Sequence, residues 1–317
     1  MSLFALIAAL LLEQAHPLSS RKHLYGWLSG YVDFFQLHFN AGAYKHGKIA
    51  WTLAVLPLLA GITVLFWLLN QAHPVFAWAF NVLVLYLTMG FRQFSHYFTG
   101  IHRAMRAGKL DEARGLLTQW RGIPSHELSA EEVARVTIEE ALIATHRNVF
   151  GVIVWFVLFS AVGLGGAAGA LLYRIGQFLR ARWSAEEEAE VSEFGMGEFG
   201  GFARKAFYVL EWLPIRMTAM SFAIVGNFED TIYCWRTQAA SWPDPEAGIL
   251  LSSGAGALGV RLGMPLPQGG MLLDRPELGV GDDADADFMQ SAVGLVWRSV
   301  VFWLLLLLLM TLASMLG

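Results

Sequence analysis

Residues 50–69 read AWTLAVLPLLAGITVLFWLL and contain no charged side chain. A helix needs about 20 consecutive apolar residues to cross the hydrocarbon core of a bilayer, so this run predicts a membrane-spanning helix. Uncharged runs of similar length follow at 74–91, 149–173 and 299–316. We therefore predict an all-α fold with about four to six membrane helices, joined by cytoplasmic helical segments.

The composition supports a membrane protein. Hydrophobic residues make up 56% of the 317-residue chain and charged residues only 15%, whereas a soluble domain is about 25% charged. The net charge of −4 and the absence of any Lys/Arg-rich run argue against a nucleic-acid partner. Cys234 is the only cysteine, which excludes an internal disulfide and a multi-thiolate metal site. We expect it to be a small buried or interfacial residue.

Two segments are less regular. Residues 2–12 are apolar but too short to span a bilayer unaided, and they lack the basic start and cleavage site of a signal peptide. They are predicted to form a short or tilted first helix. Residues 206–226 contain Glu211 and Arg216. Because ionisable groups are costly in hydrocarbon, this segment is expected at the interface or beside a protein-lined cavity.

The basic residues that flank 50–91 predict an orientation, since such residues tend to stay cytoplasmic. They lie outside both ends of this segment, which is therefore expected to be a helical hairpin with its turn, at 70–73, away from the cytoplasm.

The glycines of 163–170 indicate close helix contact, a break or a re-entrant turn. The chain is divided into N-terminal membrane helices (1–91), a cytoplasmic helical segment (92–148), membrane helices with an acidic linker (149–226), a polar Gly/Pro-rich segment (227–298) and a C-terminal membrane helix (299–317).

Ser129 and Glu132 have the spacing of a capping box, which predicts the start of a helix. Glu132, Arg135 and Glu139 fall on another face of that helix, and helix position alone makes Glu139 a solvated residue. The acidic runs 183–200 and 282–287 are interpreted as solvated linkers. Metal binding is the weaker alternative there, because EF-hand spacing is absent. No residue is assigned to a metal.

Four stretches carry a resemblance to a known family, and they occur in the order in which that family has them. The first is Ala15-His16-Pro17-Leu18. The second, 101–140, is similar to helices that read "AGDLEAAR" and "VARATIES". The third joins GGAAGALLYR (165–174) to VLEWLPIRMTA (209–219), and the fourth is GAGALGVRLGMPLPQGGMLLDRPELG (254–279). The last resembles "AGALGVRLGGP" and a following "KPWLG" turn. Together these stretches resemble the CobD/CbiB family.

The resemblance implies a membrane enzyme of late corrin assembly, which uses ATP and magnesium to join adenosylcobyric acid to aminopropanol or its phosphate. It implies a multi-pass protein of the bacterial inner membrane, with the lipid bilayer and a corrinoid substrate as partners, and it allows a homo-oligomer. A more distant relative is AmpE, a membrane protein without known enzyme chemistry. AmpE shares the element seen here at Trp212, Pro214 and Arg216.

The matched positions supply candidate site residues. Glu139 and Glu211 are the candidate catalytic acids, and the candidate ligand-binding residues are Arg216, Gly256, Gly259, Arg261, Arg174 and His16. Alternatives remain at several of them. The 254–259 glycines are expected either to approach a ligand phosphate or to form a plain tight turn. Arg174 is either a ligand residue or an interfacial anchor, and Arg216 either lines a cavity with Glu211 or extends to the interface.

The chain departs from the family at polar positions. Ile143, Ala144, Arg147 and Leu251 stand where the family has Glu, Asn, Asp and Glu. Magnesium on phosphate oxygens is held by carboxylates, so the sequence predicts weak or absent synthesis. The first hypothesis is a CobD/CbiB-type synthase, the second a non-catalytic AmpE-like signalling or scaffold protein, and a transporter is a distant third.

Overall fold

The computed structural model describes residues 2–15, 21–194 and 198–316. The chain forms two compact units, one made of Met1–Gly90 with Gly151–Pro214 and the other of Phe91–Phe150 with Ile215–Gly317. Both units are helical, and the prediction of an all-α membrane protein is confirmed.

In its described part, the first unit consists of helices joined by short loops. Their bounds are α1 (Ser2–Ala15), α2 (Arg21–Phe39), α3 (Tyr44–Ala72), α4 (Pro74–Thr88), α8 (Gly151–Ala161), α9 (Gly166–Phe194) and the first part of α10 (Phe199–Val225). The backbone of α9 is therefore helical through much of the acidic run that was expected to be a linker.

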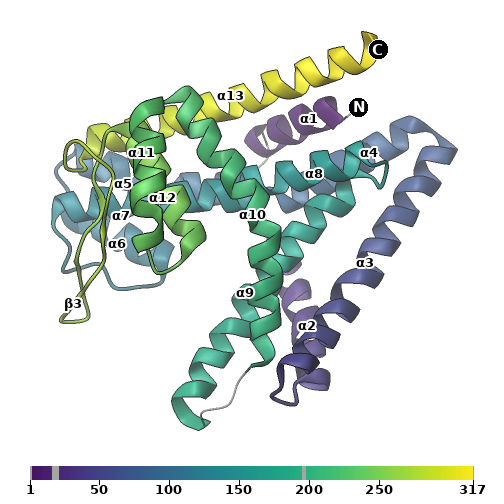
Figure 1. The fold of residues 1–317 in the computed structure, drawn as a ribbon, viewed down its shortest axis with the longest axis horizontal. Coiled ribbons are helices and arrows are strands. Elements are labelled where there is room, and N and C mark those ends of the chain that lie inside the picture. Colours follow the sequence, from purple (N-terminus) through teal and green to yellow (C-terminus); the bar gives the residue numbers. More distant parts are fainter. Residues whose placement is uncertain (1, 16–20, 195–197, 317) are drawn as a thin grey trace. The chain divides into compact units, whose positions relative to one another are not determined.

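Helices α3 and α4 form the predicted helical hairpin (Figure 1). His73 alone separates them, in an extended conformation with φ −166°. Its Nδ1 accepts a hydrogen bond from the backbone N–H of Val75 at 3.2 Å, and Pro74 occupies the first turn, where its missing N–H costs nothing. Helix α4, capped by His73 and starting with Pro74, thus follows almost directly on the end of α3, and the turn between the two helices is short.

The third apolar run is not a single helix, so the prediction of one span over 149–173 is wrong. Helix α8 ends at Ala161 and α9 begins at Gly166. Gly163 and Gly165 have φ of 77° and 85°, which side chains rarely adopt, and they reverse the chain here. Of the alternatives, the break is right. Close contact is right as well, since a Cβ at Gly169 would lie 2.0 Å from the carbonyl oxygen of Trp155.

Among the described residues, four helices are long and apolar enough to cross a membrane: Tyr44–Ala72, Ala130–Ala161, Phe199–Val225 and Ala286–Ser314. The first contains the predicted run 50–69, and the last covers the predicted run 299–316 up to Ser314. The second begins earlier than the predicted third run, and the third covers the irregular 206–226 segment up to Val225. Shorter apolar helices cover Leu3–Ala15 and Pro74–Thr88, and the latter is shorter than the run expected at 74–91.

The second unit contains further helices and two short strand pairs. The helices are α5 (Phe91–Arg106), α6 (Leu110–Arg121), α7 (Ala130–Thr145), a π-helical turn (His146–Phe150), the rest of α10, α11 (Phe228–Gln238), a 3-10 turn (Ala239–Ser241), α12 (Pro245–Leu258) and α13 (Ala286–Leu316). Strand β1 (Leu262–Gly263) pairs antiparallel with β4 (Glu277–Leu278), and β2 (Leu266–Gln268) pairs antiparallel with β3 (Met271–Leu273).

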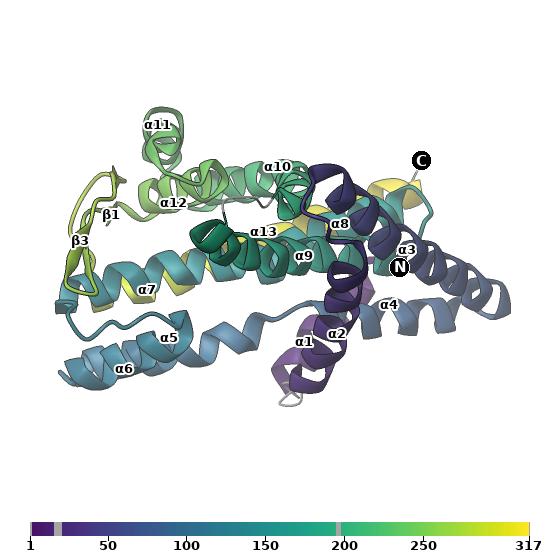
Figure 2. The same ribbon diagram turned by 90° about the horizontal axis from the view of Figure 1, so that it is seen from below.

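Helix α7 begins at the predicted capping box. The Glu132 N–H donates to Ser129 Oγ at 3.2 Å, and the Ser129 N–H donates to Glu132 Oε2 at 2.7 Å. The expectation from helix position that Glu139 is solvated is wrong, because Glu139 is 4% exposed, and Arg135 on the same face is 3% exposed. Strand β1 contacts α7, and its Gly263 N–H donates to Glu139; Figure 2 shows the strand region beside one end of α7.

Helix α12 packs closely on α11, as Figure 1 shows. The glycines of 254–259 are mostly part of α12, so the expected tight turn is confined to the helix end. There, Gly259 adopts a left-handed conformation with φ 67°. The four aspartates of 282–287 are exposed, whereas Ala284 between them is buried. Asp285 accepts hydrogen bonds from the N–H groups of Asp287 and Phe288 and thereby caps α13.

Candidate functional site

Glu139 is the centre of a buried polar network in the second unit. Its Oε1 accepts a hydrogen bond from the backbone N–H of Gly263 at 2.8 Å. Arg275 donates from Nη1 to Glu139 Oε2 at 2.8 Å and from Nη2 to Oε1 at 3.3 Å. The side chains of Arg275 and Glu139 are 11% and 6% exposed. Such a charge-assisted, two-pronged contact is strong and geometrically specific.

Arg275 also holds the backbone that crosses α7. Its Nη2 donates to the carbonyl oxygen of Gly263 at 2.8 Å, and its Nε donates to that of Met264 at 3.1 Å. The guanidinium lies 5.4 Å from the ring centroid of Trp242, a cation–π distance. Gly263 is required here, because its φ is 73° and a Cβ would lie 2.1 Å from the carbonyl oxygen of Pro276.

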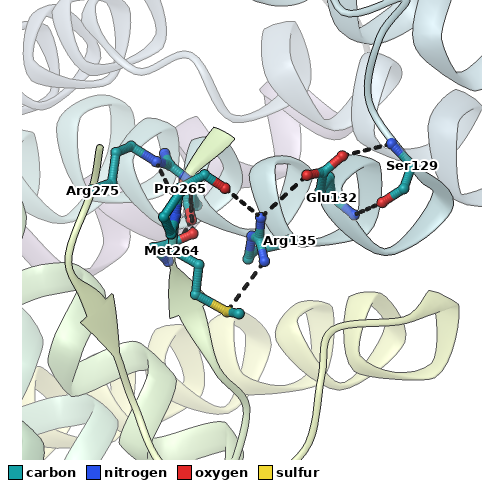
Figure 3. A network of polar contacts seen from close by, with 8 residues as sticks. Ser129, Glu132, Arg135, Met264, Pro265 and Arg275 are labelled. Atoms are coloured by element: carbon teal, nitrogen blue, oxygen red, sulfur yellow. Dashed lines mark hydrogen bonds and ion pairs between the residues drawn. The ribbon is translucent and has the colours of Figure 1, made fainter. Parts of the chain in front are cut away.

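Arg135 lies one helical turn before Glu139 and has weaker partners (Figure 3). Its Nη1 is 3.2 Å from Met264 Sδ, and its Nη2 is 3.4 Å from the carbonyl oxygen of Pro265. Glu132 Oε1 lies 4.0 Å from Nη2. Within the described part of the chain, the buried Nε has no hydrogen-bond partner. This guanidinium is therefore buried with only part of its donor capacity used.

The predicted glycine-rich segment directly precedes strand β1 of this network. In α12, a Cβ on Gly256 would lie 2.5 Å from the carbonyl oxygen of Asp230, so this glycine allows α11 and α12 to touch. Arg261 follows the left-handed Gly259 and pairs with Asp283 Oδ1 at 2.5 Å and with Glu277 Oε1 at 3.8 Å. In this structure Gly256 lies at the contact between α12 and α11, and Arg261 forms ion pairs with residues of β4 and of the segment before α13.

Arg174 is buried in the first unit rather than placed as an exposed anchor. Its Nε donates to the carbonyl oxygen of Thr88 at 2.9 Å, and its Nη1 donates to Gln177 Oε1 at 2.8 Å. Thr88 is the last residue of α4, whose final carbonyls lack helical partners. Arg174 thus caps this helix end, a favourable place for a cation.

Glu211 lies in the first unit and is 1% exposed. Arg180 Nη1 lies 3.4 Å from its Oε2, and the Tyr173 hydroxyl donates to its Oε1 at 3.4 Å. Arg216 is half-buried in the part of α10 that belongs to the second unit. His16 lies outside the described residues.

The structure therefore brings together only part of the predicted set. Glu139 joins the segment that follows Gly259 and Arg261, whereas Glu211 and Arg174 belong to the other unit. Sequence reasoning missed Arg135 and Arg275. Both had a signal: the first lies in the stretch similar to "VARATIES", and the second takes the position of the lysine in the "KPWLG"-like turn.

The described carboxylates do not fit a magnesium site as they stand. Both oxygens of Glu139 accept hydrogen bonds from cationic or backbone donors. Asp283 and Asp287 pair with arginines, Arg261 and Arg106 respectively. Among the described residues, no three His, Cys, Asp or Glu side chains gather as a metal site requires. We assign no residue to a metal and derive no step through one.

Comparison with known proteins places the chain among cobalamin biosynthesis proteins. The family model described as CobD/Cbib protein matches residues 3–296. A protein of Stutzerimonas stutzeri named cobalamin biosynthesis protein CobD is 35% identical over 97% of this chain and 98% of its own length. The protein of the same name from Chromobacterium violaceum is 34% identical, over 79% of this chain and 76% of its own.

The chain is also similar to relatives of lower sequence identity. The cobalamin biosynthesis protein CbiB of Salmonella typhimurium is 26% identical over 76% of this chain and 73% of its own length. No solved structure matches. The similarity to these relatives thus rests on sequence, and the geometry described above is that of this chain.

Proposed function

The chain belongs to the CobD/CbiB family of cobalamin biosynthesis proteins, and from this premise we propose that it forms the amide bond between adenosylcobyric acid and aminopropanol or its phosphate. ATP and magnesium are part of the proposal through the family resemblance. The proposed location is the bacterial inner membrane, with several spans and the lipid bilayer as surroundings. A homo-oligomer remains a prediction.

One observation supports this proposal most. The second and fourth stretches of resemblance, 101–140 and 254–279, are far apart in sequence, yet they meet at Glu139, Gly263 and Arg275. A chain that had lost its function would have little reason to keep a buried ion pair at this meeting point, because breaking such a pair is costly while replacing it with apolar residues is often not. The retained pair therefore favours a working site, and the lost carboxylates favour slow turnover.

A second candidate function is a non-catalytic, AmpE-like membrane protein. The observation that favours it is that both candidate acids are held by cations. Glu139 pairs with Arg275, and Glu211 pairs with Arg180. In this alternative the network only stabilises the fold, and no corrinoid binds.

Complementation distinguishes the two functions. A bacterial strain that lacks the synthase is supplied with this chain and grown on cobyric acid. We expect slow but measurable growth that Glu139→Gln abolishes and that Arg236→Ala retains. Arg236 is the matched control, because it is exposed and lies outside the matched stretches. No growth, with normal protein accumulation in the membrane, contradicts the synthase and favours the second candidate.

A further inference from the structure

Arg135 has an unusual combination of burial and poor pairing. The residue is 3% exposed. A guanidinium has five N–H donors, and taking it out of water costs free energy unless anions or acceptors replace the water. Its acceptors here are a thioether sulfur, a weak acceptor, and one carbonyl oxygen at 3.4 Å.

The unsatisfied groups lie on one edge of the guanidinium. Nε and Nη2 form the side-on edge that binds a carboxylate or phosphate through two parallel hydrogen bonds. On this edge Nε lacks a partner among the described residues, and Nη2 has only the long contact to Pro265 and the 4.0 Å contact to Glu132 Oε1. This edge is therefore only partly used, and it has the geometry that an oxyanion needs.

A second observation concerns the residue that covers Arg135. Met264 has φ 66° and is the only residue other than glycine with positive φ in the part of the chain that the structure describes. Such a conformation costs roughly 1–2 kcal/mol and is often kept where function requires it. Figure 3 shows the Met264 side chain reaching Arg135 from the neighbouring segment. The strain is thus located at the contact that would have to open.

We propose that Arg135 binds an oxyanion, a phosphate or carboxylate group of a ligand, which displaces Met264 Sδ and the Pro265 carbonyl from the guanidinium. Binding at Arg135 does not depend on the proposed amide-forming reaction. Glu132 is the neighbouring negative charge, with Oε1 4.0 Å from Nη2 and Oε2 held by the Ser129 N–H. It weakens the binding of an anion, and Glu139 is already neutralised by Arg275.

The test uses the full-length protein in detergent and measures its thermal unfolding in sodium phosphate, sodium acetate and sodium chloride at equal ionic strength. We expect phosphate, acetate or both to raise Tm relative to chloride. Arg135→Met is expected to weaken binding roughly 10- to 100-fold, the loss that one charge-assisted hydrogen bond brings. Arg135→Lys is expected to restore part of it, because the charge returns without the planar fork.

Two further variants separate binding from folding. Arg114→Met is the matched control, since Arg114 is a partly buried arginine of the same unit whose Nε and Nη1 bond to Leu128 and Asp111. It should keep the anion effect. Glu132→Gln should tighten binding a few-fold, because glutamine keeps the capping box but removes the charge.

The outcomes decide whether Arg135 binds an oxyanion and whether that oxyanion is a phosphate or a carboxylate. A Tm rise in phosphate alone assigns a phosphate group, and a rise in acetate alone assigns a carboxylate. Equal Tm values in all three salts, or a rise that Arg135→Met leaves intact, overturn the proposal. Because the readout is binding, loss of turnover with retained anion binding would contradict the synthase and leave this inference standing.

Discussion

Arg275 and Glu139 are 136 residues apart in the chain, yet Arg275 Nη1 lies 2.8 Å from Glu139 Oε2. The pair connects α7 to the segment between β3 and β4. It also fixes Gly263 and Met264, whose carbonyl oxygens accept hydrogen bonds from the same guanidinium. Loss of this arginine would therefore release both a buried carboxylate and the backbone that covers α7.

Arg275→Met is expected to lower the free energy of unfolding by about 3 kcal/mol, because it leaves the buried Glu139 carboxylate without its cation. The double variant Arg275→Met/Glu139→Met should lose less than the sum of the two single variants. Denaturant unfolding in detergent measures both. Lys109→Met is the control, since its pair with Glu112 is exposed and worth little. Additive losses would show that the two residues do not interact.

Gly256→Ala tests the contact between α11 and α12. The added Cβ would lie 2.5 Å from the carbonyl oxygen of Asp230, and moving this backbone away would cost free energy. We expect a loss of about 1–3 kcal/mol in stability, the range for overpacking. Gly115→Ala is the matched control in α6, where nothing lies within 4 Å. It should stabilise by up to about 1 kcal/mol through helix propensity. Equal effects of the two substitutions would contradict close packing at Gly256.

Much of the fold was predictable from local patterns. The uncharged run at 50–69 and the capping box at Ser129 act through nearby residues, so the sequence predicted α3 and the start of α7. The break at 162–165 was open from sequence, because glycines permit close contact and a turn equally well. The positive φ values of Gly163 and Gly165 decide it, and an apolar run does not specify backbone conformation.

The site was predictable only in part for the same reason. The position of Glu139 was found through the matched stretch, but helix periodicity placed it in solvent. Its burial depends on the segment 262–278, which crosses α7 from more than a hundred residues away. Gly256 shows the converse: a glycine expected either beside a ligand phosphate or in a tight turn lies in α12, against the backbone of Asp230.

Cys234 is expected to be unreactive in the folded protein. Burial raises the pKa of its thiol to about 11, and the nearby Asp230 charge acts in the same direction. The thiolate is the nucleophile, so maleimide labelling at pH 8 should be slow. Since the pKa is raised from 9.0, the thiol's contribution to stability is complete below pH 9 and lost between about pH 9 and 11. Gly115→Cys, an exposed control site, should label fast. Equally fast labelling of wild-type protein would contradict the burial.

The orientation of the α3–α4 hairpin is testable with the same chemistry. Gln71 is exposed beside the turn, and the buried Cys234 gives a low background. Gln71→Cys in intact cells, with the outer membrane made permeable, should react with a reagent that cannot cross the inner membrane. Basic residues on both outer flanks predict this orientation. Labelling only after the inner membrane is opened would show the opposite orientation, with the turn on the cytoplasmic side.

Turnover by the purified protein tests the synthase most directly. The protein in detergent is given adenosylcobyric acid, aminopropanol phosphate, ATP and magnesium, and the product is followed by mass. We predict slow formation of the amide product that requires ATP and magnesium, is lost in Glu139→Gln and is retained in Arg236→Ala. Absence of any product from wild-type protein that unfolds cooperatively and binds phosphate or acetate at Arg135 would contradict the proposed synthase.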